Sequence, residues 1–307
     1  MYTNLPMSSI QIVEVGPRDG LQNEPDIVST ADKLAMIGAM IDAGIRRMEV
    51  ASFVHPQRVP QMADAEAVIA GLPDRKDVSY IGLTLNKRGV LRALATREGG
   101  RRGVDEIGCV IVATDTFGQK NQGQTVAEGI TEAREMIRFA KAEGLIAQVT
   151  ISAAFGCPFE GDVPPQRIVD IAHAVLEAGP AEIALADTIG VGVPAQVTDL
   201  FGRLREFVPD DVNLRAHFHN TRGTGIANAW AAMEAGVTTL DASLGGLGGC
   251  PFAPRATGNI ATEDLIYLAE RSGIAHGLDL DSVIAANHCM AKLLGRELPS
   301  LVARAAA

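Results

Sequence analysis

The chain has 307 residues, of which 47% are hydrophobic, 21% charged and 4% aromatic, and its formal net charge is −10. This composition predicts a soluble globular protein whose core is built from small aliphatic side chains, as in an α/β fold. The acidic balance argues against nucleic acid or an anionic membrane as the main partner, and no apolar run is long enough to span a bilayer.

Eight short β-rich runs alternate with longer segments of helical periodicity. The predicted strands cover residues 10–15, 47–51, 78–83, 106–113, 147–153, 182–186, 213–218 and 239–242. The predicted helices between them include residues 31–43, 125–143, 165–178, 194–207 and 226–235. Several of these helices end at a glycine that suits a left-handed C-cap, namely Gly44, Gly144, Gly179 and Gly236. A helix, a glycine and then a strand form the repeating unit of a parallel α/β fold.

Eight βα units in roughly 250 residues are typical of a TIM (β/α)8 barrel. A doubly wound open sheet is the alternative, but its first strand should lead into G-x-G-x-x-G. Here the first strand leads into G-P-R-D-G at residues 16–20. We therefore expect one catalytic domain over residues 1–307, with the barrel from about 8 to 275. An extension from about 278 to 307 should hold an appended helix at 282–294 and a frayed alanine-rich tail.

Four cysteines are present, and none of them forms a C-x-x-C pair. A chain of this length needs no disulfide staples, so we expect reduced thiols in the cytoplasm. The first residues also lack the basic and apolar blocks of a secretory signal. Cys109 lies within a predicted strand and should be a core residue, and Cys157 should be structural.

Two histidines separated by one residue, His217 and His219, lie at the end of a predicted strand. Side chains alternate along a strand, so both imidazoles should point to the same place, as two metal ligands do. Two exposed imidazoles on a surface strand are the alternative. Asp19 follows the first strand and would add an oxygen ligand, although an aspartate before glycine also suits a turn. A carboxylate and two imidazoles suit a divalent cation such as Mg²⁺ or Mn²⁺, and Zn²⁺ less well.

Charged residues follow other strands at the same rim, where TIM barrels carry their catalytic groups. Arg18 stands beside Asp19, and its permanent charge should face an anion, including one that develops during a reaction. Glu49 is a carboxylate in an apolar strand and is a proton-transfer candidate, as is Asp187. Ion pairs that hold Arg18 at the barrel mouth are the structural alternative for both carboxylates.

The last predicted strand is followed by G-G-L-G-G-C at residues 245–250. So many glycines allow a close approach to a ligand, and the thiol of Cys250 could act as an acid or base. A phosphate-binding loop or a plain hinge are the alternatives. Asn259 could complete the metal ligands or simply form a turn, Thr262 could cap the last barrel helix, and Glu263 could support the metal site or favour the helix dipole.

Taken together, these stretches resemble the 3-hydroxy-3-methylglutaryl-CoA (HMG-CoA) lyase family, which belongs to the TIM-barrel metallolyases. The matching segments are residues 14–24, 51–54, 59–62, 156–161, 187–192, 217–219, 248–251 and 258–264. The resemblance implies that Asp19, His217, His219 and Asn259 bind the metal. It also implies that Arg18, Glu49, Asp187 and Cys250 are catalytic and that the partner is an acyl-CoA thioester, in a protein that commonly forms a homodimer. The substrate contacts expected from this pattern are Gln22, Ser52, Lys120, Asn121, Thr150 and Arg222.

The sequence departs from the family pattern near the expected substrate pocket. The family's Asp-Thr-Tyr-Gly after the second histidine reads Asn-Thr-Arg-Gly at residues 220–223, Pro25 replaces a basic residue, and an expected Arg-Gly-Tyr reads Gln-Val-Thr at 148–150. These departures leave the expected reaction in place, which is cleavage of HMG-CoA to acetyl-CoA and acetoacetate. They also raise an alternative acyl group, such as a longer-branched hydroxyglutaryl-CoA or citramalyl-CoA.

Two other functions are less well supported by the sequence. A condensing enzyme like the isopropylmalate-type synthases would be expected to carry a regulatory domain after the barrel. A metal-binding scaffold or sensor would not need polar groups gathered on one barrel rim, which usually indicates chemistry.

Overall fold

Eight parallel strands close into a barrel in which each strand pairs with its neighbours in chain order and β8 pairs with β1. The computed structural model describes residues 7–249 and 258–306, so Cys250, one of the expected catalytic residues, lies outside the described residues. The strands are β1 (Gln11–Glu14), β2 (Arg47–Ser52), β3 (Ser79–Leu83), β4 (Glu106–Val112), β5 (Ile146–Ser152), β6 (Glu182–Asp187), β7 (Asn213–Phe218) and β8 (Thr239–Ala242). Each expected strand is present, and the prediction of a TIM barrel is confirmed.

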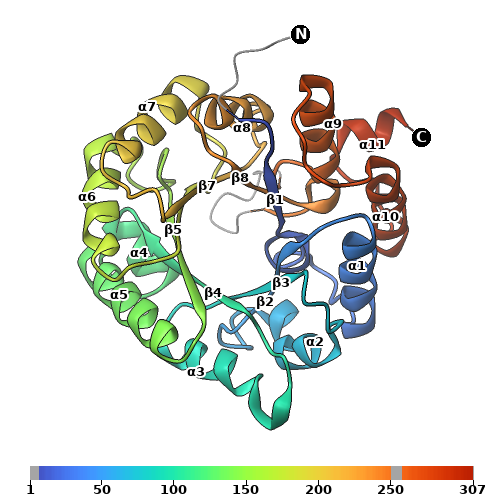
Figure 1. Ribbon diagram of the computed structural model, residues 1–307, viewed down its shortest axis with the longest axis horizontal. Helices are drawn as coiled ribbons and strands as arrows, with labels where there is room; N and C mark the ends of the chain where they lie inside the picture. Colours follow the sequence, from blue (N-terminus) through green and yellow to red (C-terminus); the bar gives the residue numbers. More distant parts are fainter. Residues whose placement is uncertain (1–6, 250–257, 307) are drawn as a thin grey trace.

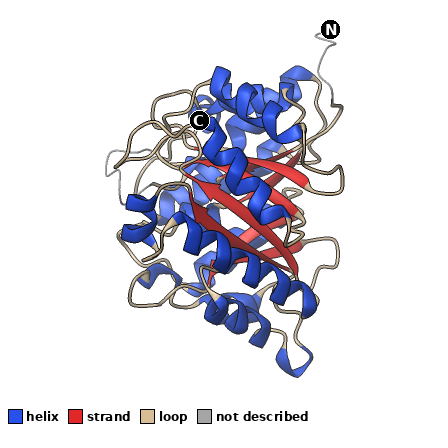
Figure 2. Cartoon of the chain, turned by 90° about the vertical axis from the view of Figure 1, so that its left-hand side faces the viewer, coloured by secondary structure: helices blue, strands red, loops and turns tan. Residues whose placement is uncertain are grey.

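Helices surround the strands on the outside (Figure 1), and the side view shows them packed along the length of the sheet (Figure 2). They are α1 (Thr30–Asp42), α2 (Ala65–Gly71), α3 (Lys87–Ala95), α4 (Asp115–Asn121), α5 (Val126–Ala142), α6 (Pro165–Leu176), α7 (Pro194–Arg205), α8 (Gly225–Glu234), α9 (Thr262–Ser272), α10 (Leu280–Leu293) and α11 (Leu301–Ala305). The four glycines expected at helix ends all have positive φ angles, between 67° and 110°. A residue without a Cβ adopts this conformation at little cost, which is why the chain turns there into the next strand.

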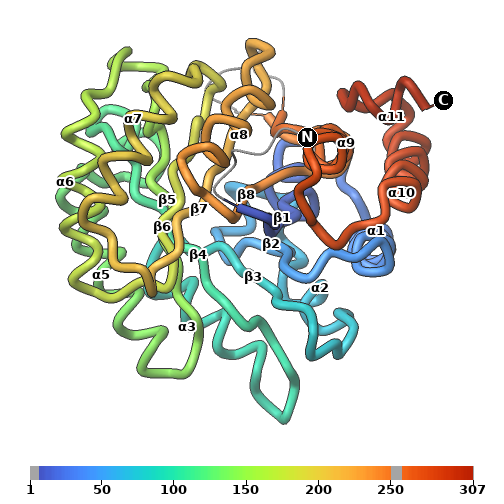
Figure 3. Tube along the Cα trace, turned by 45° about the horizontal axis from the view of Figure 1, so that its top comes forward, coloured from blue at the N-terminus to red at the C-terminus, as the bar shows by residue number. Residues whose placement is uncertain are grey.

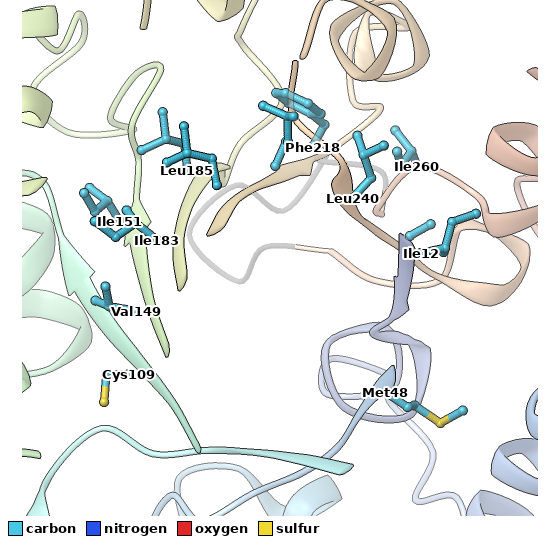
Figure 4. Packing of buried hydrophobic residues seen from close by; sticks show 14 of the residues in the cluster. Ile12, Met48, Cys109, Val149, Ile151, Ile183, Leu185, Phe218, Leu240 and Ile260 are labelled. Atoms are coloured by element: carbon cyan, nitrogen blue, oxygen red, sulfur yellow. The ribbon is translucent and has the colours of Figure 1, made fainter. Parts of the chain in front are cut away.

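The core lies between the strands and the helices. Alternate side chains of the strands point outward into it, and Figure 4 labels several of them, including Met48, Val149 and Phe218. Cys109 belongs to this layer, where burial raises its pKa to about 12, so the expectation of a core cysteine is confirmed. Cys157 is also buried, with its Sγ 3.0 Å from the Oγ1 of Thr114.

The inside of the barrel differs from this outer layer because many of its buried side chains are charged. A small separate apolar cluster contains Val13, Val15 and Ile81. Below the barrel mouth, Arg47 binds the carboxylates of both Glu106 and Glu182 at 2.7–3.0 Å. The lumen is therefore filled largely by an ion network in place of the aliphatic layers that TIM barrels usually carry.

The C-terminal segment does not fray as expected but forms α11. Ser300 caps this helix by accepting a hydrogen bond from the N–H of Ala303, and Asp264 accepts from the N–H of Val302. These acceptors satisfy N–H groups that a frayed end would leave to water. Figure 3 shows α10 and α11 outside the barrel, with α10 beside α1. Within the described ranges, no helix combines the length and apolar character needed to cross a bilayer.

Candidate active site

The loop after β1 is a turn of π-helix, Gly16–Gly20, which carries Arg18 and Asp19 at the C-terminal end of the barrel. A Cβ on Gly16 would lie 2.4 Å from the carboxylate of Glu14, so only glycine fits there. That carboxylate accepts hydrogen bonds from the N–H of Gly16 and the N–H of Leu244, both at 2.8 Å. Glu14 thereby ties the loop after β1 to the loop after β8.

Asp19, His217 and His219 each offer one ligand atom, and these atoms lie within 4.8 Å of one another. The Nε2 of His219 is 3.9 Å from the Oδ2 of Asp19, and the centres of the two imidazole rings are 5.2 Å apart. β7 ends at Phe218, so His219 lies one residue beyond the strand. Both histidines nevertheless face the same space, as the alternation rule predicts.

Asn259 joins this cluster because the segment that begins at Gly258 runs along the ends of β7 and β8. The N–H of Ile260 donates to the carbonyl of Phe218, and His219 and Asn259 form an isolated bridge. The Nδ2 of Asn259 donates to Asp19 Oδ2 at 2.9 Å and to the carbonyl of Leu247 at 3.0 Å. Its Oδ1 is buried and has no hydrogen-bond partner in the structure.

The donor set fits a divalent cation. It combines a carboxylate, two imidazoles and the amide oxygen of Asn259, and among the described residues neither this oxygen nor the buried Nδ1 of His219 has a hydrogen-bond partner. Burial and then the neighbouring His217 lower the pKa of His219 to about 4, which leaves a neutral imidazole with a lone pair at neutral pH. Burial alone would raise the pKa of Asp19, but Arg18 and the two histidines outweigh it and hold that pKa below its usual range.

Arg18 sits beside the cluster between two carboxylates. Its Nη1 is 2.6 Å from Asp19 Oδ1, and its Nε donates to Glu49 Oε1. Of the two expected partners at the barrel mouth, Glu49 therefore binds Arg18. The side chain of Arg18 is 12% exposed, against 5% for that of Glu49, so the guanidinium can be reached from the mouth while its partner lies beneath.

Asp187 ends β6 and holds the loop that follows. Its two carboxylate oxygens accept from the N–H groups of Val191 and Gly192, both at 2.9 Å. Burial raises the pKa of Asp187 in spite of these bonds. Asp187 is thus bound to backbone groups and not to Arg18, and its raised pKa makes it a better base than an exposed aspartate.

Glu263 lies at the start of α9 and supports the glycine-rich loop after β8. Its carboxylate accepts from the N–H of Gly245 at 3.0 Å and from Asn287 Nδ2 at 2.7 Å. The cap of α9 is Ala261 and not Thr262 as expected. The hydroxyl of Thr262 instead donates to Glu14 at 2.7 Å, because a buried carboxylate is close enough to compete for it.

The buried carboxyl groups of Glu14 and Glu263 predict how stability depends on pH. Burial raises their pKa values to about 7 and about 8, so the folded protein keeps protons that the unfolded chain releases. Their contribution to stability is complete below pH 4.5 and is lost as the pH rises towards 8. Glu263→Gln should make this loss shallower by up to about 1.4 kcal/mol per pH unit.

Urea unfolding at pH 5, 6, 7 and 8 would measure the effect of Glu263→Gln. Glu270→Gln changes an exposed carboxylate on the same helix and is the matched control, which should keep the wild-type pH dependence. The prediction would be contradicted if the free energy of unfolding changed equally with pH in all three proteins between pH 5 and 8.

The expected substrate contacts are dispersed around the mouth. Ser52 is fully buried and its Oγ has no hydrogen-bond partner, whereas Gln22 and Thr150 are partly exposed. Arg222 donates to the carbonyls of Ile189 and Gly190 at 3.0 and 2.9 Å, so it braces the loop after β6. Lys120 and Asn121 end α4, where the Lys120 ammonium lies 4.8 Å from the ring centre of Phe159.

One functional neighbour was missed at the sequence level. Asp241 in β8 lies 3.0 Å from His217 Nδ1, and Arg215 lies behind it at 3.5 Å. The signal was present, because a carboxylate in a buried strand is the same pattern that singled out Glu49. It was overlooked because a lone aspartate in a strand does not indicate which neighbour it meets.

Comparison with known proteins agrees with this geometry. The HMGL-like family model matches residues 9–290. The chain is 42% identical to an (R)-citramalyl-CoA lyase of Chloroflexus aurantiacus (97% of this chain, 95% of the relative) and 39% identical to the hydroxymethylglutaryl-CoA lyase YngG of Bacillus subtilis (95% of each). It is also similar to the solved structure of an HMG-CoA lyase from Acinetobacter baumannii in complex with coenzyme A and 3-methylmalate, with a TM-score of 0.90 and 38% identity over 97% of this chain and 95% of that one.

The family match covers most of the chain, and the resemblance inferred from the motifs is confirmed. The chain belongs to the HMGL-like family and is an enzyme of the carbon–carbon lyase class that these relatives represent.

Proposed function

We propose that this chain is a divalent-metal-dependent lyase that cleaves HMG-CoA to acetyl-CoA and acetoacetate. The observation that carries the proposal is the cluster of Asp19, His217 and His219 with the unpartnered Oδ1 of Asn259, beside the Arg18–Glu49 pair. The relatives at 38–42% identity are lyases of HMG-CoA or of (R)-citramalyl-CoA, which are both CoA thioesters.

The charges inside the barrel suit a bound cation. Among the described residues that join the ion pairs of the lumen and mouth, three guanidinium groups face five carboxylates, so negative charge is in excess even if His217, which pairs with Asp241, is counted as a cation. They are Arg18, Arg47 and Arg215 against Asp19, Glu49, Glu106, Glu182 and Asp241. A divalent cation would balance that excess, and when bound it would act as a Lewis acid that lowers the pKa of the substrate hydroxyl.

Asp187 and His219 are the two groups able to take the hydroxyl proton. Burial raises the pKa of Asp187, so it can accept a proton at neutral pH. The neutral ring of His219 has a single lone pair, which a bound cation would use, so Asp187 is the base when the cation is in place and His219 is the base only if it is not a ligand. Once the proton is removed, the electron pair on oxygen forms the ketone and the bond to the thioester's α-carbon breaks. The leaving fragment is a thioester enolate, whose negative charge the exposed side of Arg18 can stabilise.

The enolate must then gain a proton at carbon to become acetyl-CoA. We assign this step to Cys250, as a thiol acid, while Glu49 holds Arg18 in place. CoA contacts from Lys120 and Asn121 on α4 belong to the same proposal. We also propose that residues 1–307 form a single catalytic unit, that the protein is a homodimer, and that the bound ion is Mg²⁺ or Mn²⁺.

A second substrate, (R)-citramalyl-CoA, is favoured by two observations. The relative with 42% identity is a lyase of that substrate, and Thr150 and Arg222 stand where the family pattern has tyrosines. The same residues would carry out the same bond cleavage on it, with pyruvate as the second product.

Purified protein assayed against a panel of hydroxyacyl-CoA thioesters would test both substrates. We expect release of acetyl-CoA in the presence of Mg²⁺ or Mn²⁺ and its loss in excess chelator. The higher kcat/KM between HMG-CoA and (R)-citramalyl-CoA identifies the substrate. Chelator-resistant turnover, or no turnover of either thioester with metal present, would contradict the proposal.

A further inference from the structure

A row of buried charged side chains crosses the barrel from its lower end to the metal cluster. Arg47 binds Glu182 at 2.8 Å, and Arg215 Nη1 lies 3.4 Å from the same carboxylate. On its other side, Arg215 Nε lies 3.5 Å from Asp241 Oδ1. Asp241 Oδ2 then meets His217 Nδ1 at 3.0 Å. Opposite charges therefore alternate without a break up to an expected metal ligand.

The strand register explains this alignment. Arg215 pairs with Thr239 across β7 and β8, and His217 and Asp241 each follow two residues later along their strands. Residues two apart share a face, so Arg215 lies one layer below the level at which His217 and Asp241 meet. Because β7 and β8 are neighbours in the barrel (Figure 1), the side chains of His217 and Asp241 lie next to each other.

The contact with Asp241 decides which nitrogen of His217 faces the metal cluster. An ionised carboxylate only accepts hydrogen bonds, so the Nδ1 of His217 must carry the proton. The Nε2 then keeps its lone pair and is the atom free to bind a cation. Without Asp241, the neutral ring could carry its proton on either nitrogen.

Arg215 is too deep to touch a substrate. It is 2% exposed, whereas the side chains of Arg18 and Asp19 at the mouth are 12% and 16% exposed. Among the described residues its Nε and Nη1 have no hydrogen-bond partner, and its Nη2 donates to Thr150 Oγ1 at 3.4 Å. A guanidinium held between Glu182 and Asp241 acts on the metal cluster through Asp241, and its contact with Thr150 is separate from that cluster.

We infer that Asp241 and Arg215 are positioning residues, which set the tautomer and orientation of His217 for a divalent cation. The inference rests on the proposed metal site. Asp241 acts directly through His217 Nδ1, and Arg215 acts one step further away by holding Asp241. Arg47, at the far end of the row, supports the barrel but has no contact with Asp241 among the described residues.

Mn²⁺ binding followed by electron paramagnetic resonance would test the inference. Loss of an outer ligand-supporting group typically weakens metal binding about 10–100-fold, and we expect that loss in Asp241→Ala. Asp241→Asn keeps an oxygen that can accept from Nδ1 and should recover much of the affinity. Arg215→Met should weaken binding several-fold. Arg92→Met removes an arginine that binds Glu66 between the outer helices α2 and α3, away from the row, and should bind Mn²⁺ as the wild type does.

Nitrogen-15 spectra of the metal-free protein supply a second readout that needs no cation. At alkaline pH, where the ring is neutral, the wild type and Arg92→Met should contain a histidine with its proton on Nδ1, identified as His217 by its absence in His217→Gln, and Asp241→Ala should lose that tautomer. Unchanged Mn²⁺ affinity or an unchanged tautomer in folded Asp241→Ala would overturn the inference alone. A wild-type chain that binds no Mn²⁺ would overturn the metal site and the inference together.

Discussion

Replacing Arg18 with methionine is expected to lower kcat by about 100–1,000-fold, the usual cost of removing one group that stabilises a developing oxyanion. The guanidinium lies between Asp19 and Glu49, and its side chain is 12% exposed at the barrel mouth. Burial would lower the pKa of Arg18, but the two carboxylates outweigh that effect and raise it, so its charge persists at any working pH. That charge is therefore present when the thioester enolate forms.

The Arg18→Met protein should still fold and bind metal. Glu49 would lose its partner, and the cost of that loss falls on stability and not on the metal ligands. Asp19 would keep its hydrogen bond from Asn259 and its two histidine neighbours. The loss should therefore lie in kcat and not in Mn²⁺ affinity.

Arg92→Met is the matched control for this experiment. Arg92 also binds a carboxylate with two nitrogens, at 2.7 and 3.0 Å from Glu66, but does so between the outer helices α2 and α3. Its replacement should leave turnover unchanged. Turnover of Arg18→Met within about tenfold of the wild type, measured at saturating metal, would rule out the proposed role of Arg18.

Periodicity predicted the fold well because each element of this barrel is locally encoded. A strand shifted by one residue would expose its apolar side chains, and glycines such as Gly144 and Gly236 end helices by adopting positive φ angles. The same reasoning brought His217 and His219 together. These features depend on the order of neighbouring residues and on nothing distant.

Other parts of the site depend on contacts that the local sequence does not contain. The π-turn at Gly16–Gly20 is held by Glu14, which also binds Leu244 and Thr262 from the opposite end of the barrel sequence. Thr262 consequently donates to Glu14 instead of capping α9. Pairing between the segment at Asn259 and the end of β7 is likewise a tertiary event.

The lumen was the least predictable region. Its charged residues were visible as ionisable side chains in buried strands, but both partners of Arg47 come from strands that are not adjacent to β2 in sequence. Arg47 in β2 binds Glu182 in β6, across the barrel. Arg47 and Glu182 come together only because the barrel is closed, and the row of charged side chains that ends at His217 depends on the same closure.

Replacing His219 with leucine is expected to abolish metal-dependent activity while leaving the metal-free fold intact. Its imidazole is buried, its Nδ1 has no partner, and its nearest carboxylate oxygen is 3.9 Å away. An apolar side chain of similar size removes an unpartnered buried group, so the free energy of unfolding without metal should stay within about 1 kcal/mol of the wild type or rise. With metal, a Lewis acid worth several kcal/mol in the transition state is lost, and kcat should fall by about 1,000-fold or more.

Thermal unfolding with and without Mn²⁺ separates these two effects, because a cation that binds only the folded state raises the Tm. The wild type should show that rise and His219→Leu should not. His173→Leu is the control, since His173 stacks on Phe207 at the outer helices with ring centres 3.6 Å apart and should keep both the rise and the turnover. A buried polar group with no partner among the described residues is expected to have one outside the protein, and a wild-type rise in Tm for His219→Leu would show that this partner is not the metal.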